Sequence, residues 1–378
     1  MMGTWMQQMA QGWVLAALTT SAFTLGLVTF ASSIPMLALT MWGGVVADRF
    51  DKRRILFVAQ IAQAALAITI GWLIGQERIA VWHLVAAGAT LGIVTAFEMP
   101  AASAMVPQLV TRDRLSAAIA IDRSMFHLTR FAGPALGGLL IAQVGLAWAF
   151  YANALSFGAL MIALVTIKLR PVERPPGDDG RQTGMKEGIA YVRGDRPTLA
   201  MLSLLATVTT CISPFFMVLM PLYSQHILHI GPAEHGWLMA SSGIGAFAGS
   251  VWLLSIPAAR RRAYLFGAVT AVSLAMAGLA AARHVAWAIA AMITLTLGTS
   301  TLFGLANTVV QERAPDHLRG RVSALAGMSF FAVLPFSGLL VSKFADLVGM
   351  RAAMGTAAVC FGLGATLLLR SHRPTTAV

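Results

Sequence analysis

The sequence has few charged residues and almost no cysteine, and each shortage excludes a class of protein. Only 11% of its 378 residues are charged, whereas a soluble domain carries about 25%. A soluble protein with 57% hydrophobic residues could not cover its surface with polar groups, so a large soluble domain is excluded. Cys211 and Cys360 are the only cysteines and each lies in an apolar run, which excludes a disulfide scaffold and a thiolate metal site.

The sequence also lacks the motifs of hydrolytic and nucleotide chemistry. It has no His-Glu-x-x-His motif, no serine nucleophile motif and no Gly-x-x-x-x-Gly-Lys-Ser/Thr loop. We therefore expect neither an enzyme nor an ATP-driven pump, and no cofactor or metal. The net charge of +12 does not indicate a nucleic-acid partner, because the basic residues recur in short groups between apolar runs instead of clustering on one face.

Uncharged apolar runs alternate with short polar breaks, and many have the roughly 20 residues that cross a bilayer. The runs 55–75, 263–282 and 284–311 contain no Asp, Glu, Lys or Arg. The pattern does not match the short alternating strands of a membrane barrel, so we predict an all-α membrane protein with twelve spans. Their expected positions are 3–17, 22–46, 55–75, 80–106, 116–142, 147–168, 198–225, 236–257, 263–282, 285–310, 322–344 and 351–369.

The distribution of Lys and Arg predicts how the spans are oriented. Loops on one side hold 21 of the 27 basic residues, and loops on the other side hold four, namely Arg78, Arg283, Lys343 and Arg351. Since the basic loops are the cytoplasmic ones, we expect a cytoplasmic C-terminus. The first span is shorter than a full span and no basic residue precedes it. This favours a truncated first helix with a missing N-terminal piece over a short tilted helix or a cleaved signal peptide.

The longest polar segment, 170–196, divides the chain into two similar halves. We expect it to be a cytoplasmic linker that includes a short amphipathic helix near 185–192. Two pairs of segments match in order, and they predict a duplicated six-helix unit of the kind typical of secondary transporters, whose substrate site lies between the halves. The pairs are 112–117 with 319–324 and 138–140 with 338–340, and the predicted halves are 1–169 and 197–378.

Two motifs resemble those of a known family. The stretch from Gly44 to Arg54 follows the pattern Gly, three residues, Asp-Arg, any residue, Gly, any residue, Arg-Arg, with Asp51 in place of the second Gly. Gly133-Pro-Ala-Leu-Gly-Gly138 is similar to the Gly-Pro-x-x-Gly-Gly core of a motif of proton-driven exporters. The chain resembles the major facilitator superfamily, in the bacterial branch of enterobactin-exporter-like and transmembrane secretion effector proteins. Thr19-Thr-Ser21 and Phe97-Glu-Met-Pro100 also resemble that branch.

The resemblance implies a monomeric transporter of the bacterial cytoplasmic (inner) membrane. It would export small amphipathic molecules such as drugs or siderophores by alternating access, with membrane lipids, the small-molecule substrate and protons as partners. The arginine that drug antiporters carry in the fourth span is absent. This sequence therefore departs from the pattern of proton-driven exporters at the feature that bears on proton coupling. Two alternatives stay open. A lipid or lysophospholipid flippase would have a lateral opening with apolar walls, and a membrane sensor would not transport at all.

The first motif predicts a conformational latch at the cytoplasmic end of the second span. A carboxylate at this position can pair with nearby arginines or face a helix N-terminus, and such a contact could hold one state and release in the other. The alternative is a positively charged anchor of the span. The positive-inside rule would explain the basic residues of such an anchor but not the acidic Asp48. The candidate latch residues are Gly44, Asp48, Arg49, Arg53 and Arg54.

The second motif predicts a bent helix and a close contact in the fifth span. Pro134 removes one backbone hydrogen bond, and Gly133, Gly137 and Gly138 allow another helix to approach closely. The resemblance implies that this helix is the eighth span, which carries a small-residue face. The alternative is generic packing of small residues.

Charged residues inside the spans are the sharpest functional candidates, because they are costly in lipid. Glu98 lies well inside the fourth span, and Asp122, Arg123 and Arg130 lie inside the fifth. One interpretation is a structural ion-pair network between these spans. The functional interpretation makes Glu98 a proton or cation site and Arg130 an anchor for an anionic substrate group.

Polar residues of the first span predict a wet cavity. Gln7, Gln8 and Gln11 recur with Thr4 at helical spacing, and three glutamines facing lipid would be costly. We therefore expect this stripe to line a cavity. Asn307 of the tenth span is a further candidate lining residue, although a lone Asn more often joins two helices.

Overall fold

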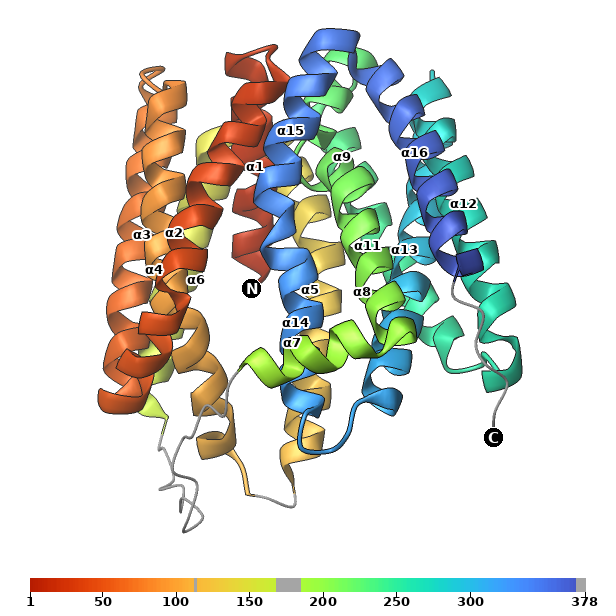
Figure 1. Cartoon of the computed structure of the whole chain (residues 1–378). Helices are drawn as coiled ribbons and strands as arrows, with labels where there is room; N and C mark the ends of the chain where they lie inside the picture. Colours follow the sequence, from red (N-terminus) through yellow and green to blue (C-terminus); the bar gives the residue numbers. More distant parts are fainter. Residues whose placement is uncertain (112–113, 168–184, 372–378) are drawn as a thin grey trace. The chain divides into compact units, whose positions relative to one another are not determined.

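The structure is a computed structural model that describes residues 1–111, 114–167 and 185–371 (Figure 1). All regular elements in these ranges are helical. They form two compact units, Met1–Gly177 with Pro221–Ala240 and Asp178–Met220 with Ser241–Val378. Most of the expected linker lies outside the described residues, so its limits and those of the two halves stay a prediction.

The first unit is built mainly from six helices that pack in pairs. Helix α2 lies along α4, α3 lies against α6, and α1 lies against α5. Side-chain caps fix two helix starts, because Ser21 Oγ accepts from Thr24 N at 3.4 Å and Asp51 Oδ1 accepts from Arg53 N at 2.9 Å. The helices are α1 (Met2–Leu18), α2 (Ala22–Arg49), α3 (Lys52–Gly75), α4 (Val81–Leu109), α5 (Leu115–Gln143) and α6 (Leu146–Thr166).

The backbones of α2 and α4 touch. A Cβ atom on Gly43 would lie 2.0 Å from the carbonyl oxygen of Ala96, and one on Gly92 would lie 1.9 Å from that of Ser32. Small residues allow membrane helices to pack this closely. The contact fixes the position of α4, the helix that carries Glu98.

The second unit contains shorter elements as well as long helices. Helix α12 packs against α13 and α16, and α8 packs against α13, α14, α15 and α16. Along the chain from α7 onward, η2 belongs to the first unit, and α10 and α11 contribute residues to both units. These elements are α7 (Met185–Gly194), α8 (Arg196–Cys211), α9 (Ser213–Met217), α10 (Met220–Leu222), the π-helix η2 (Tyr223–Ile227), α11 (Pro232–Leu253), the 3-10 helix η3 (Ala258–Arg260), α12 (Arg261–Ala281), α13 (Val285–Arg313), α14 (Arg319–Phe331), α15 (Val333–Val348) and α16 (Met350–Ser371).

Every predicted span coincides with helix, but two of the spans are interrupted. The predicted spans at 198–225 and 322–344 each consist of consecutive shorter helices, and a proline lies just beyond each break. A proline ring collides with the carbonyl group four residues earlier. Accordingly, α8 ends at Cys211 just before Pro214, α9 ends four residues before Pro221, and α14 ends four residues before Pro335. Eight helices in the described ranges are long and apolar enough to cross a membrane.

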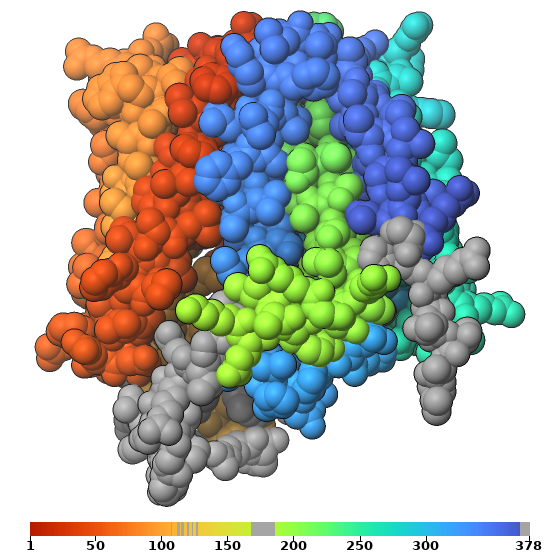
Figure 2. Space-filling model, viewed as in Figure 1, coloured from red at the N-terminus to blue at the C-terminus, as the bar shows by residue number. Residues whose placement is uncertain are grey.

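The short helix expected near 185–192 is present as α7, at residues Met185–Gly194. It packs against α14 and α8. Figure 2 shows α7 in yellow-green on the surface, lying against the blue residues of α14. Its Val192 is buried and its Lys186 and Glu187 are exposed, which is the pattern of an amphipathic helix.

Candidate functional site

Glu98 is held by two glutamines of the neighbouring helix α3. Gln60 Nε2 donates to Glu98 Oε1 at 2.8 Å, and Gln63 Nε2 donates to Glu98 Oε2 at 2.5 Å. Gln60 is 1% exposed and Gln63 is 6% exposed, whereas Glu98 itself is half-buried. Each carboxylate oxygen therefore has one amide donor. The sequence signal for this site was the pair of glutamines, three residues apart in an otherwise apolar span. Our prediction did not include them.

The arginines that were candidates for pairing with Glu98 are not its partners in the described part of the chain. The guanidinium of Arg130 lies 5.8 Å from the centre of the Trp5 ring, a cation–π contact. Asp122 is exposed, and the side chain of Arg123 lies outside the described residues. The structure thus pairs Glu98 with the side-chain amides of α3, and it places Arg130 over the ring of Trp5 in α1.

The glutamine stripe of α1 lines a small cavity inside the first unit, whose wall is polar on one side and apolar on the other. The cavity has a volume of about 30 Å³. Asn153 Nδ2 of α6 donates to Gln7 Oε1 at 2.8 Å on its wall. Gln8 is exposed and is not part of this lining. The lining residues are Thr4, Gln7, Gln11, Gln63, Leu66, Ile70, Ala87, Leu91, Asn153 and Phe157.

The Gly-Pro motif of α5 makes the close helix contact that the resemblance implied. A Cβ atom on Gly138 would lie 2.9 Å from Gly236 Cα, and one on Gly236 would lie 2.6 Å from the Pro134 carbonyl oxygen. Gly236 lies in the first turns of α11, within the first unit. Gly133 and Gly137 meet α1 instead, because their added Cβ atoms would meet Trp5 and Met6.

The C-terminal end of α1 is bound by the π-helix η2. Gln225 Nε2 donates to the Trp13 carbonyl oxygen at 2.8 Å, and His226 Nε2 lies 3.0 Å from the Ala16 carbonyl oxygen. The ring of the buried His235 lies 5.2 Å from that of Trp13. Short π-helical turns often occur at functional sites, and we did not predict this one.

The candidate latch residues lie at the α2–α3 turn. Asp48 and Arg49 are exposed at the end of α2, and neither they nor Arg53 and Arg54 form an ion pair within the described residues. Asp51, which departs from the family pattern, has a structural task because its carboxylate caps α3. The substitution of Gly by Asp at this position therefore adds a helix cap.

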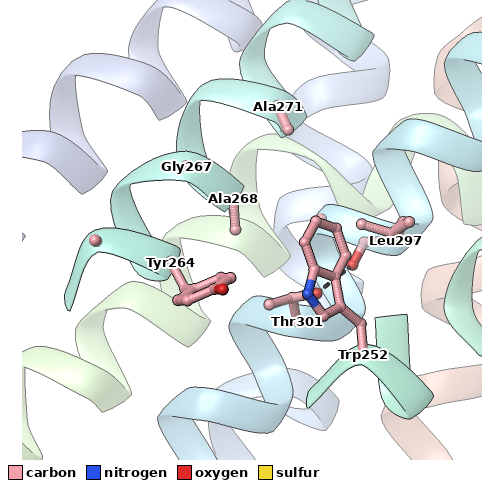
Figure 3. A pocket seen from close by; sticks show the side chains of 9 residues that line it. Trp252, Tyr264, Gly267, Ala268, Ala271, Leu297 and Thr301 are labelled. Carbon is pink, nitrogen blue, oxygen red and sulfur yellow. Dashed lines mark hydrogen bonds between the residues drawn. The ribbon is translucent and has the colours of Figure 1, made fainter. Parts of the chain in front are cut away.

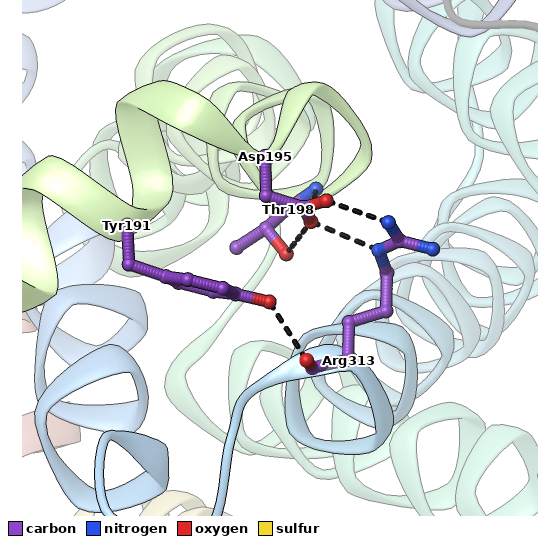
Figure 4. A network of polar contacts seen from close by, with 4 residues as sticks. All are labelled: Tyr191, Asp195, Thr198 and Arg313. Atoms are coloured by element: carbon purple, nitrogen blue, oxygen red, sulfur yellow. Dashed lines mark hydrogen bonds and ion pairs between the residues drawn. The ribbon is translucent and has the colours of Figure 1, made fainter.

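The start of α8 and the end of α13 are joined by a polar network in the second unit (Figure 4). Asp195 accepts from Arg313 Nε at 2.9 Å and from Arg313 Nη2 at 2.6 Å. It also caps α8 through Thr198 N at 3.1 Å, and Tyr191 Oη donates to the Arg313 carbonyl oxygen at 2.7 Å. The bond from Arg313, helped by Thr198, lowers the pKa of Asp195 to about 2.

Two further sites of the second unit bear on the candidate list. Asn307 Nδ2 donates to the Phe303 carbonyl oxygen of its own helix at 2.9 Å. A groove of about 330 Å³ lies among α11, α12 and α13, and Figure 3 shows Trp252 and Tyr264 beside Leu297 and Thr301 in its wall. Its lining is mostly apolar, with Gly267, Ala268 and Ala271 leaving the space open.

Long apolar helices that enclose a carboxylate and several amides define a multi-pass membrane protein of the transporter type. The profile of the transmembrane secretion effector family matches residues 1–378. The chain belongs to this family, a branch of the major facilitator superfamily, and it is a transporter rather than an enzyme.

Relatives of known name are similar over nearly the whole chain. The multidrug efflux pump Tap of Mycobacterium tuberculosis is 30% identical over 94% of this chain and 87% of its own length. The staphyloferrin A transporter of Staphylococcus aureus is 25% identical over 95% of this chain and 91% of its own length.

Solved structures show the same fold. A bacterial homologue of the human lysosomal transporter Spinster, inward-facing and occupied, superposes with a TM-score of 0.74 at 13% identity, covering 98% of this chain and 94% of its own. The fold is therefore the twelve-helix fold of major facilitator transporters.

Proposed function

We propose that the protein exports small amphipathic molecules of the drug or siderophore type, by alternating access and in exchange for protons. The observation that carries this proposal is Glu98, an acid inside a membrane span that binds amides and forms no ion pair within the described residues. Ionisable residues inside spans commonly mark ion or proton paths. The names of the relatives, a multidrug efflux pump and a siderophore transporter, support the direction of transport and the substrate class.

Each polar group then has a task in the cycle. Glu98 takes up and releases the proton, and Arg130 beside Trp5 anchors an anionic or aromatic part of the substrate. Gln7 and Gln11 line the polar side of the cavity in the first unit, and Gln8 and Asn307, which were also candidates, are not part of this lining. Asp122 and Arg123 are further candidates for the proton path.

Two contacts between helices would control the conformational change. Gly138 and Gly236 form a backbone contact that must loosen when α5 and α11 separate. Asp48, with Gly44, Arg49, Arg53 and Arg54, would form a latch at the turn between α2 and α3. Because Asp48 is exposed here, its partner would be met in another state of the cycle.

The protein would work as a monomer in the bacterial inner membrane, with its C-terminus in the cytoplasm. The excess of basic residues in one set of loops supports this orientation. Membrane lipids, the substrate and protons would be its partners, without a cofactor.

Efflux from bacteria that lack their own pumps tests the proposal. The cells are loaded with a panel of fluorescent amphipathic dyes, antibiotics and siderophores, with and without a proton uncoupler. We expect faster efflux of at least one compound class than in cells with the empty vector, and loss of this gain with the uncoupler. Efflux that the uncoupler leaves unchanged would contradict proton exchange, and absence of any efflux would contradict the exporter.

One observation favours a lipid flippase as the second candidate. The groove beside α12 has apolar walls and is formed by residues such as Trp252 and Gly267 that are exposed. An acyl chain could enter such a groove from the bilayer. A labelled lysophospholipid therefore belongs in the same panel, and its selective translocation would replace drug export by lipid transport.

A further inference from the structure

Gln63 has two sides, and each side contacts a different polar feature of the first unit. One side donates to Glu98 Oε2 at 2.5 Å, and the other lines the cavity that contains the amides of α1. Gln63 is buried, at 6% exposed, and it is shared by the two features. Among the described residues, it is the only one that both lines this cavity and binds Glu98.

The cavity is suited to water. A buried site needs roughly 10–15 Å³ and two to four polar partners to hold one water molecule. This cavity has about 30 Å³ and is bordered by Thr4, Gln7, Gln11 and Asn153 as well as Gln63. Asn153 donates to Gln7 and accepts from Ser156, and Gln63 donates to Glu98, which leaves the polar atoms of Thr4 and Gln11 for water. Thr4, one of the lining residues, is exposed.

The site of Glu98 is also prepared for the protonated acid. The Oε1 atom of Gln60 is buried and has no hydrogen-bond partner. A protonated Glu98 carries an O–H group that needs an acceptor, and Gln60 Oε1 reaches it when the amide turns by half a rotation. The pair of glutamines can thus satisfy both the charged and the neutral carboxyl group.

Charged groups of the surrounding helices do not offer another route within the described residues. Helices α1 and α6 contain no Asp, Glu, Lys or Arg. Those of α2 and α3 lie at the helix ends, Asp122 of α5 is exposed, and Arg130 is engaged with Trp5. The cavity shares a lining residue, Gln63, with the site of Glu98.

We propose that the cavity beside Gln63 is a water site through which protons reach Glu98, and that Gln63 is the residue that separates the two. The inference rests on the proposed role of Glu98. When the Gln63 side chain swings aside, a hydronium ion in the cavity transfers its proton to Glu98 and remains as water. Gln63 and Gln60 then bind the neutral carboxyl group. Gln63 is thus a positioning residue that controls the rate at which the proton is exchanged.

Hydrogen–deuterium exchange of the Glu98 carboxyl group tests this role. The full-length protein is reconstituted in lipid, and the infrared C=O band of protonated Glu98 is identified by its loss in Glu98→Gln. Time-resolved transfer to D₂O then gives the exchange rate. We expect Gln11→Leu, which removes the polar amide from the cavity lining, to slow the exchange roughly tenfold or more, a barrier higher by about 1.4 kcal/mol. Gln63→Ala should speed it.

A matched control lies on the same helix. Gln8→Leu makes the same change at an exposed residue outside the cavity lining, and it should leave the exchange rate unchanged. Ala87→Leu fills the cavity from α4 and replaces Gln11→Leu if that variant does not fold. An unchanged rate in folded Gln11→Leu or Ala87→Leu, or an equal slowing in Gln8→Leu, would overturn the inference but leave Glu98 as the proton site. Absence of any Glu98 band in the native protein would overturn both.

Discussion

Asp195 binds Arg313 through both of its carboxylate oxygens, at 2.9 and 2.6 Å. The same carboxylate caps α8 through the backbone N of Thr198. One acid therefore joins the start of α8 to the end of α13, at a position just outside the predicted span. Its two tasks can be separated by mutation, because Asn caps a helix about as well as Asp but carries no charge.

We expect Asp195→Asn to lower the free energy of unfolding by about 0.5–1 kcal/mol, the value of a partly exposed ion pair. Asp195→Ala should cost about 1 kcal/mol more, because it also removes the cap. Thermal unfolding in detergent at neutral pH measures both. Asp316→Asn is the control, since Asp316 pairs with Arg319 on the surface and its loss should have no measurable effect.

The contribution of Asp195 should depend on pH. Its pKa in the folded protein is lowered to about 2, below the ordinary value of about 3.9 in an unfolded chain. The stabilisation is therefore complete above that ordinary value and disappears as the pH falls toward 2. The difference in melting temperature between the native protein and Asp195→Asn should shrink over this range. A difference that stays constant below pH 4 would contradict the assignment.

The contact between Gly138 and Gly236 should not tolerate a side chain. An added Cβ on Gly138 would lie 2.5 Å from the Pro232 carbonyl oxygen, so the helices must move apart. We expect Gly138→Ala and Gly236→Ala each to reduce transport severalfold at normal expression. Gly158→Ala on α6 is the control, because an added Cβ there meets nothing within 4 Å. Equal transport by all three variants would show that close packing is not required.

Asp48→Asn should slow transport more than it weakens substrate binding. A latch changes the populations of the states, while the distant cavity keeps its contacts. The maximal rate should fall and the half-saturating substrate concentration should stay near the native value. Asp51→Asn, an equivalent change in the same turn that retains the cap of α3, should transport normally. A native maximal rate with a large loss of affinity would remove Asp48 from the latch.

Labelling of single cysteines tests the orientation. With Cys211 and Cys360 replaced, a cysteine introduced at Asp178 or Thr375 should not react with an impermeant reagent applied to intact cells. Both should react after the membrane is permeabilised. The expectation follows from the basic loops on one side of the predicted spans. Reaction in intact cells would reverse the topology.

The sequence predicted the location of the helices well, because run length and charge are local properties. It did not predict the breaks near Pro214 and Pro335, although the prolines are visible. Pro134 lies inside the unbroken α5, so a proline alone does not decide between a bend and a break. The outcome depends on whether neighbouring helices satisfy the freed backbone groups.

The candidate site was predicted only in part. Glu98 stood out because a charge in an apolar run is rare, but its partners could not be deduced. Nearby arginines were the obvious choice by charge, whereas the structure gives Glu98 the amides of Gln60 and Gln63. Which face of α3 meets α4 is set by helix packing, as in the contacts at Gly43 and Gly92, and sequence spacing does not reveal it.

Transport by Glu98→Gln in reconstituted vesicles tests the central claim most directly. Efflux is measured across a range of pH, with a proton gradient and as downhill exchange without one. We predict that the variant folds in normal yield, retains downhill exchange, loses proton-driven export and shows a flat pH profile. Proton-driven export by Glu98→Gln with the native pH profile would contradict the account.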